Sequence, residues 1–134
     1  MASLEEAIYS ALANDETLSG LVTGVYNTIA LQSTTYPFII FQLISAEDDY
    51  TLTQRVREVY RYQVRCVAEG YDNETCVAAM RKVDALLTGA SLSVSSYTFW
   101  YARRSRQFAY AETDFAGKAY QTVGAEWIIE MDPT

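Results

Sequence analysis

The residues of this chain that could do chemistry are carboxylates, arginines and tyrosines, because the 134-residue sequence contains no histidine. A serine-histidine-aspartate triad, a histidine zinc site and acid-base catalysis by imidazole are therefore excluded. The sequence also lacks a glycine-rich phosphate loop with its lysine, and its two cysteines do not have the spacing of a metal knuckle. We expect no enzymatic activity, no cofactor and no metal.

The carboxylates form three groups whose spacings occur in ligand or catalytic sites. Glu47, Asp48 and Asp49 are adjacent and could bind a cation, but neighbouring carboxylates at the tip of a hairpin are more often a solvated turn. Two pairs have the same-face spacing of a β-strand that a glycosidase dyad would need: Glu112 with Asp114, and Glu126 with Glu130. Solvation at the surface explains all three groups with fewer assumptions.

An arginine stripe runs through residues 55–68, where residue types alternate with a period of two. On a β-strand this pattern separates a packed face from a cationic face. Like charges on one face repel one another unless carboxylates or a partner neutralise them. Either neighbouring strands supply the carboxylates, or the stripe meets acidic loops of the next copy in head-to-tail contacts that close into a ring. The stripe consists of Arg55, Arg57, Arg61 and Arg65.

A second basic cluster lies in residues 103–106, which we expect to form a turn between two strands. Its arginines face a partner or the lumen of a ring, or they belong to a plain exposed loop: Arg103, Arg104 and Arg106. The chain as a whole has a net charge of −7. This charge argues against a general nucleic-acid-binding protein, since such proteins usually show a strongly basic face.

Aromatic residues are concentrated near the second basic cluster. The chain has eleven tyrosines, more than a small core needs, and such enrichment is typical of protein interfaces. Packing in the core is the alternative explanation. The concentrated residues are Tyr97, Phe99, Trp100, Tyr101, Phe108 and Tyr110.

The elements that position these residues begin with a long β-hairpin. Residues 36–44 are β-branched and aromatic, and Pro37 is tolerated at the start of a strand or on an edge. Residues 46–54 supply a polar connection, and residues 55–68 return as an antiparallel strand. The packed face of this second strand is broken by Glu58 and otherwise carries Val56, Tyr60, Tyr62, Val64, Cys66 and Ala68.

Two main helices are predicted. In the first, Ser3 and Glu6 form a capping box, and the buried face consists of Leu4, Ala7, Ile8, Ala11 and Leu12. Leu18, Leu21 and Val22 indicate one more helical turn. The second begins at a cap, Asp72 or Asn73, and ends at Gly89 in a left-handed conformation. Its buried stripe is Cys76, Val77, Met80, Val83 and Leu87. We expect Cys66 and Cys76 to be buried free thiols.

The remaining segments complete an α+β fold. Residues 25–30, 97–101, 107–113 and 118–131 predict strands, and the last has one apolar face: Ala119, Val123, Ala125, Trp127, Ile129 and Met131. We expect an antiparallel or mixed β-sheet with two main α-helices packed on one face and a long β-hairpin. The chain, residues 1–134, should form a single domain. Without a run of about 18 apolar residues or a signal-type N-terminus, we expect it to be soluble and unexported.

This order of elements resembles that of the tail-completion proteins of tailed bacteriophages. The resemblance covers nearly the whole chain and includes no catalytic signature. It rests on the capped N-terminal helix, the helix of residues 71–87, the late strand pair and two strands, Tyr36-Pro37-Phe38-Ile39-Ile40 and Tyr62-Gln63-Val64-Arg65-Cys66.

The resemblance implies a tail terminator, a structural virion protein that forms a hexameric ring on the end of the tail tube. The ring stops tail polymerisation and provides the surface for head attachment. The implied partners are further copies of the chain, the tail tube protein and the head-tail connector protein, with DNA passing through the lumen without sequence-specific binding and no membrane. The implied location is the tail or neck of the virion, after assembly in the host cytoplasm.

By position, two segments match the loops that contact neighbours and tube in this family: residues 45–54, with Asp48, Asp49 and Tyr50, and residues 103–118. Two alternatives remain. One is a head-tail connector or stopper ring with an arginine-lined lumen next to DNA. The other, from a different class, is a small α+β ligand-binding domain or enzyme.

Overall fold

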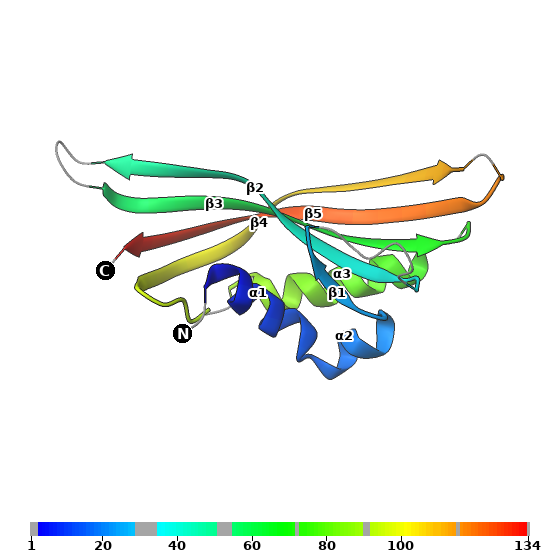
Figure 1. Ribbon diagram of the computed structural model, residues 1–134, viewed down its shortest axis with the longest axis horizontal. Coiled ribbons are helices and arrows are strands. Elements are labelled where there is room, and N and C mark those ends of the chain that lie inside the picture. Colours follow the sequence, from blue (N-terminus) through cyan, green and yellow to red (C-terminus); the bar gives the residue numbers. More distant parts are fainter. Residues whose placement is uncertain are drawn as a thin grey trace.

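The computed structural model describes residues 3–28, 35–50, 55–71, 73–89, 92–114 and 116–133. These residues form an α+β fold in which helices cover one face of a sheet (Figure 1). The helices are α1 (Leu4–Ala13), α2 (Glu16–Leu21) and α3 (Glu74–Leu87). The strands are β1 (Val25–Asn27), β2 (Phe38–Tyr50), β3 (Arg55–Glu69), β4 (Tyr97–Thr113) and β5 (Ala119–Pro133).

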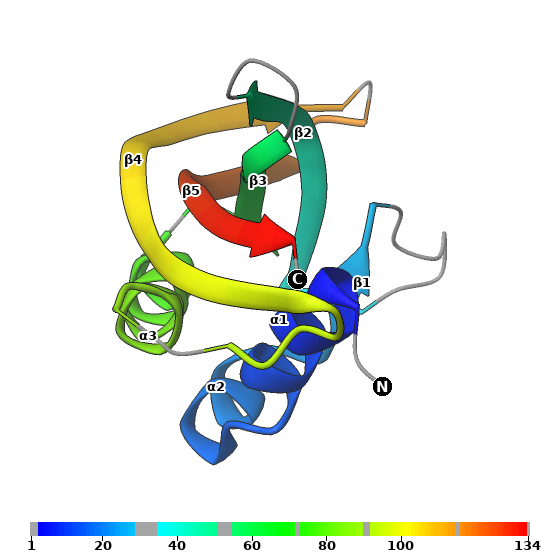
Figure 2. The same cartoon turned by 90° about the vertical axis from the view of Figure 1, so that its left-hand side faces the viewer.

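The sheet is mixed, as expected, with the strand order β1-β2-β3-β5-β4. β1 pairs with β2 in parallel, and the other neighbours are antiparallel. Figure 2 shows that β2 and β4 curve strongly while α1, α2 and α3 lie together on one side. The β2–β3 hairpin and the β4–β5 hairpin therefore extend from a common centre toward opposite ends of the molecule (Figure 1).

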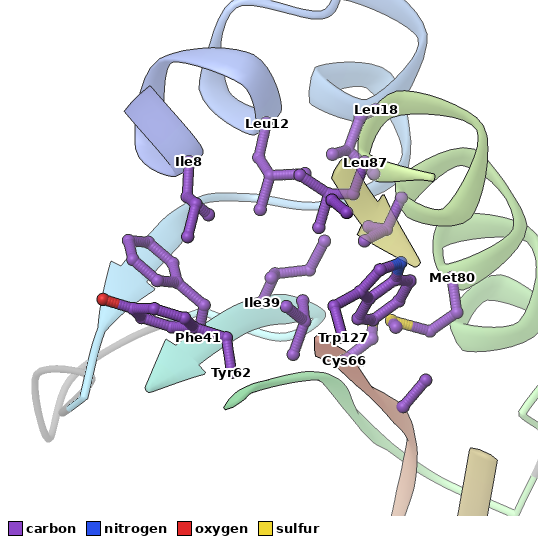
Figure 3. Packing of buried hydrophobic residues seen from close by; sticks show 14 of the residues in the cluster. Ile8, Leu12, Leu18, Ile39, Phe41, Tyr62, Cys66, Met80, Leu87 and Trp127 are labelled. Carbon is purple, nitrogen blue, oxygen red and sulfur yellow. The ribbon is translucent and has the colours of Figure 1, made fainter. Parts of the chain in front are cut away.

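One face of the sheet packs against the helices and holds the core. Along β3 the alternation predicted from the sequence is confirmed, since Tyr62, Val64, Cys66 and Ala68 are buried. Figure 3 shows Tyr62 and Cys66 of β3 and Trp127 of β5 on the side of the sheet where Ile8 of α1 and Leu18 of α2 also point. All belong to one core cluster. Trp127 is fully buried, and its indole Nε1 donates a hydrogen bond to the Thr88 hydroxyl at 3.0 Å. The predicted apolar face of β5 is therefore correct.

The helix ends agree with the sequence in part. The Ser3 hydroxyl accepts a hydrogen bond from the amide of Glu6 at 3.2 Å, as an N-cap should. At α3, Asn73 occupies the N-cap position without capping through its side chain. Its backbone (φ −106°, ψ 12°) is not in the extended conformation that directs a cap toward the first amides. The other predicted cap, Asp72, lies outside the described residues. Gly89 has a φ of +74°, the left-handed conformation expected there.

Two predicted connections are wrong because the strands continue through them. Residues 46–50 were expected in a polar connection, but they pair with β3 up to Tyr50 opposite Arg55. Residues 103–106 were expected in a turn, but they belong to β4, which pairs with β5 from end to end. Register shifts between Phe99 and Tyr101 and between Arg104 and Arg106 accommodate an extra residue at each place. A polar segment can thus remain a strand when its backbone pairing continues and a bulge accommodates each extra residue.

Candidate functional site

The candidate site is the outer face of the sheet, which lies opposite the helices. In β3 this face carries Arg57, Arg61 and Arg65, because they alternate with the buried residues. Next to them, β5 places Glu126, Ile128 and Glu130 on the same face, opposite Gln63, Arg61 and Val59. The arrangement sets a row of carboxylates beside the arginine stripe.

Glu126 is the centre of the charged contacts on this face. One carboxylate oxygen lies 3.2 Å from Nη1 of Arg61, and the other lies 3.4 Å from Nε of Arg106. Glu126 is buried, whereas the side chain of Arg106 is 68% exposed. Two guanidinium groups on different strands therefore hold one carboxylate across β5, and this contact ties β3, β5 and β4 together.

The other arginines of the stripe also find partners within the chain. Arg57 lies 3.8 Å from Glu130 and sits 4.4 Å above the centre of the Trp100 ring, a cation-π contact. Arg65 donates hydrogen bonds to the side-chain oxygens of Gln42 and Gln63. The cross-paired hypothesis is therefore correct for Arg57 and Arg61. The side chain of Arg55 lies outside the described part of the structure.

The second basic cluster does not exist as one cluster. Because residues 103–106 are strand and not turn, their side chains separate between the two faces of the sheet. Arg104 faces α3 and pairs with Asp84 at 3.4 Å. Arg103 lies over the ring of Tyr101, with 5.6 Å from the guanidinium carbon to the ring centre. Arg103 and Arg106 remain exposed, and Arg106 reaches Glu126.

The acidic candidates are spread along β2. Glu47 and Asp48 are exposed, and as neighbours in a strand they project to opposite faces of the sheet. The side chains of Asp49 and Tyr50 lie outside the described residues. Within the residues that the structure describes, no group of three histidine, cysteine, aspartate or glutamate side chains could hold a metal ion.

Three of the four carboxylates in the two candidate pairs have structural contacts. Glu126 and Glu130 contact arginines, as described above. Asp114 forms the β4–β5 turn, since one of its carboxylate oxygens accepts hydrogen bonds from the amides of Ala116 and Lys118, each at 2.9 Å. These hydrogen bonds lower the pKa of Asp114 below the ordinary value of 3.8, and the one from the Lys118 amide has the largest effect.

A buried carboxylate on the helix-facing side is a feature that sequence reasoning missed. Glu58 is buried and accepts hydrogen bonds from the hydroxyl groups of Tyr60, at 2.6 Å, and Tyr97, at 3.1 Å. Burial and the hydrogen bond to Glu58 raise the pKa of Tyr60 well above its usual range, so this phenol stays protonated. A glutamate that interrupts an apolar strand face two residues before a tyrosine is the signal in the sequence. The cluster is a polar element of the core.

The cysteines are free and buried, as predicted. The Cys76 thiol contacts the backbone oxygen of Cys66 at 3.4 Å. The hydrogen bond with Cys76 and burial raise the pKa of the Cys66 thiol. A protonated, enclosed thiol is a poor nucleophile, which applies to Cys66, and both buried side chains serve as small core residues.

The aromatic concentration divides between core and surface. Tyr97 and Phe99 pack against the core cluster. Trp100 and Tyr110 are 51% and 46% exposed. Core packing therefore explains Tyr97 and Phe99, and an interface role for the exposed aromatic residues stays a prediction.

A hollow of about 310 Å³ lies between α3 and the β4–β5 hairpin. Its lining is apolar apart from Arg104 and Gln107, and includes Met80, Phe108 and Trp127. Arg104 is already paired with Asp84. An active site needs several polar groups that converge on a substrate, and this lining does not provide them. Among the described residues, no helix is long and apolar enough to cross a membrane.

Comparison with known proteins connects this architecture to a family. Residues 6–121 match the model of the family described as "Tail completion protein gp17". The fold is similar to that of a chain in the solved structure titled "Virion of native gene transfer agent (GTA) particle", with a TM-score of 0.73 and 21% sequence identity. That match covers 96% of this chain and 95% of the other chain. No curated protein matches the sequence.

Proposed function

Because the chain belongs to the tail completion protein gp17 family, we propose that it caps the end of a phage tail tube as a ring. In this proposal the ring stops tail polymerisation and provides the surface to which the head attaches. Membership of this family makes the protein a structural component of the virion tail. The observation that carries the proposal is the family match, which spans α2, α3 and β1–β4.

Capping of this kind is a geometric function. The end of a growing tube exposes unpaired edges and uncovered interface, to which the next tube subunit would add. A ring that covers this end and presents a different far surface blocks that addition. No bond needs to be made or broken. The ion pairs of Arg57, Arg61, Arg104 and Arg106 with carboxylates of the same chain support a structural role of this type.

The proposed partners follow from the same role. The ring is a hexamer of this chain that contacts the tail tube protein on one side and the head-tail connector protein on the other. DNA passes through its lumen without sequence-specific binding. Three arginines of the outer face contact groups within the chain, Arg57 and Arg61 through glutamates. This observation favours a passive lumen over the arginine-lined DNA contact that a stopper ring would use.

The experiment is deletion of the gene for this protein in its phage, with complementation, and measurement of tail lengths by electron microscopy. The proposal predicts overlong, headless tails in the deletion and a return to uniform length on complementation. Tails of normal length that merely lack heads would contradict the terminator role and favour the stopper alternative.

A further inference from the structure

The sheet has two strand edges beside which the described residues place no further strand. On β2, β1 pairs only with residues 39–41, so residues 43–50 have β3 on one side alone. We call residues 43–50 the acidic edge. On β4, the last strand of the sheet, the amide of Gly89 donates to the backbone oxygen of Ala102 and covers the edge at that point. Residues 103–113 continue beyond it, and we call them the basic edge.

Such long edges are templates for pairing with another chain, and proteins usually shorten or cover them. Exposed apolar side chains lie on both edges here. Leu43 and Ile44 on the acidic edge are 42% and 44% exposed, and Tyr110 lies exposed on the basic edge. In a monomer these apolar side chains stay exposed to water and contribute no burial free energy. A neighbouring strand would remove them from water.

The charges of the two edges determine which strand can pair with which. The acidic edge includes Glu47 and Asp48, both exposed, while the basic edge begins with Arg103 and includes the exposed Arg106. Pairing the acidic edge with itself would bring like charges together, which is unfavourable across a strand pair. Pairing the acidic edge of one copy with the basic edge of the next joins opposite charges. A head-to-tail contact of this type repeats around a ring when the rotation closes.

The strand directions agree with such a contact. β3 and β4 run in the same direction, because both are antiparallel to β5, and β2 runs opposite to them. A copy related by rotation therefore presents its β2 antiparallel to β4, and the alternation of the sheet continues across the boundary. Glu47 lies opposite Val59 and Arg103 opposite Ile128, so both charged side chains belong to the outer face. In a continuous sheet they would share that face.

We propose that the acidic edge of one copy pairs antiparallel with the basic edge of the next copy, so that the sheets of the ring join head to tail. This inference rests on the proposed ring and identifies the strands that form it. The two edges come from opposite halves of the sheet, so the pairing requires a stagger between copies. Tilted strands in a closed sheet have such a stagger.

A charge-exchange experiment tests the partner choice. Glu47→Lys and Arg103→Glu, each alone, should raise the concentration needed for half-assembly by at least about tenfold, because like charges then face each other. The double variant should restore assembly to within a few-fold of the original protein. Arg81→Glu, the same charge change at an exposed position of α3, is the matched control and should assemble normally. Thermal melts of each variant verify that the chain is folded.

Disulfide trapping tests the geometry on purified protein and on assembled phage tails. Ala46 lies opposite Tyr60 and Arg104 lies opposite Trp127, so both belong to the helix-facing side of the sheet, and both are exposed. When Glu47 faces Arg103 in an antiparallel pair, Ala46 faces Arg104, so Ala46→Cys combined with Arg104→Cys should form a ladder of linked copies on mild oxidation. Each single variant should stay unlinked, since the native thiols are buried.

The outcomes separate this inference from the proposed function. Two results together would overturn the edge pairing and leave the capping role intact. These are normal ring formation by both charge variants and no ladder from the double cysteine variant. Linked dimers from a single variant on assembled tails, in the yield of the double variant, would also overturn the edge pairing, since within a ring they require pairing of like edges. A protein that is monomeric in solution and forms no ring on assembled tails would overturn the ring and the edge pairing together.

Discussion

At the scale of single residues, Gly124 shows why one position of β5 accepts no side chain. A Cβ at this position would lie 2.5 Å from the ring of Phe108 and 2.8 Å from the backbone oxygen of Val64. The ring of Phe108 therefore lies across the glycine, on the strand opposite it in the register. The glycine permits this close packing of β4 and β3 on either side of β5.

Gly124→Ala is expected to destabilise the protein by about 1–3 kcal/mol, since the backbone of β3 cannot move away without loss of pairing. Gly20→Ala is the matched control, because Gly20 lies in α2 and a Cβ added there would have no neighbouring atom within 4 Å. That change should be neutral or stabilise by up to about 1 kcal/mol. Urea denaturation of both variants measures the difference, and equal effects would contradict the packing described.

Trp127 provides a second test at this scale. The side chain is fully buried and donates to Thr88. Trp127→Ala should cost about 3–5 kcal/mol of unfolding free energy, since the large cavity is only partly closed by relaxation. Trp127→Phe keeps most of the packing and loses the hydrogen bond, and should cost less. Denaturation curves in which alanine and phenylalanine behave alike would show that packing is not the dominant contribution.

At the scale of elements, the sequence predicts the apolar faces better than the ends of the strands. The period-two pattern of residues 55–68 indicates the buried face of β3 correctly, because burial alone decides which side chains face the helices. The sequence pattern divides β4 into two strands. The bulges at Trp100 and Ser105 shift the alternation, and the three arginines next to the second bulge resemble a turn.

The candidate site could be predicted only in part for a related reason. The arginine stripe is visible in the sequence because its members are two or four residues apart. Its partners are not visible, since Glu126 and Glu130 come from a strand more than 60 residues later whose position beside β3 is a property of the topology. The same is true of the pairing of Tyr97 with Glu58.

The β4–β5 turn has a pH dependence that follows from Asp114. Its pKa is lower in the folded chain than the ordinary 3.8, so the turn stabilises the fold above that value, and this contribution is lost as the pH falls through the folded pKa. Asp114→Ala should therefore lower the melting temperature at neutral pH, and the difference from the original protein should shrink below about pH 4. Thermal melts at several pH values test this. A difference that stays constant into acid would contradict it.

At the scale of the whole molecule, the protein is a helix-backed sheet with two hairpins that extend in opposite directions (Figure 1). A shape of this kind leaves long edges at the periphery, while its helices and core stabilise the centre. The charges on the described part of the outer face are largely neutralised within each copy. In the proposed ring, contacts between copies can therefore form through the acidic edge, the basic edge and the hairpins while the core of each copy stays unchanged.

We propose that the protein acts as a ring on the tail tube. The most direct test is light scattering coupled to size exclusion, over a concentration series, with the protein alone and after incubation with purified tail tubes. A ring of this kind should have a mass of about six chains, or tubes should gain about six chains at an end and no longer elongate. A protein that remains a single 15.1 kDa chain under every condition, with tubes that continue to grow, would contradict it.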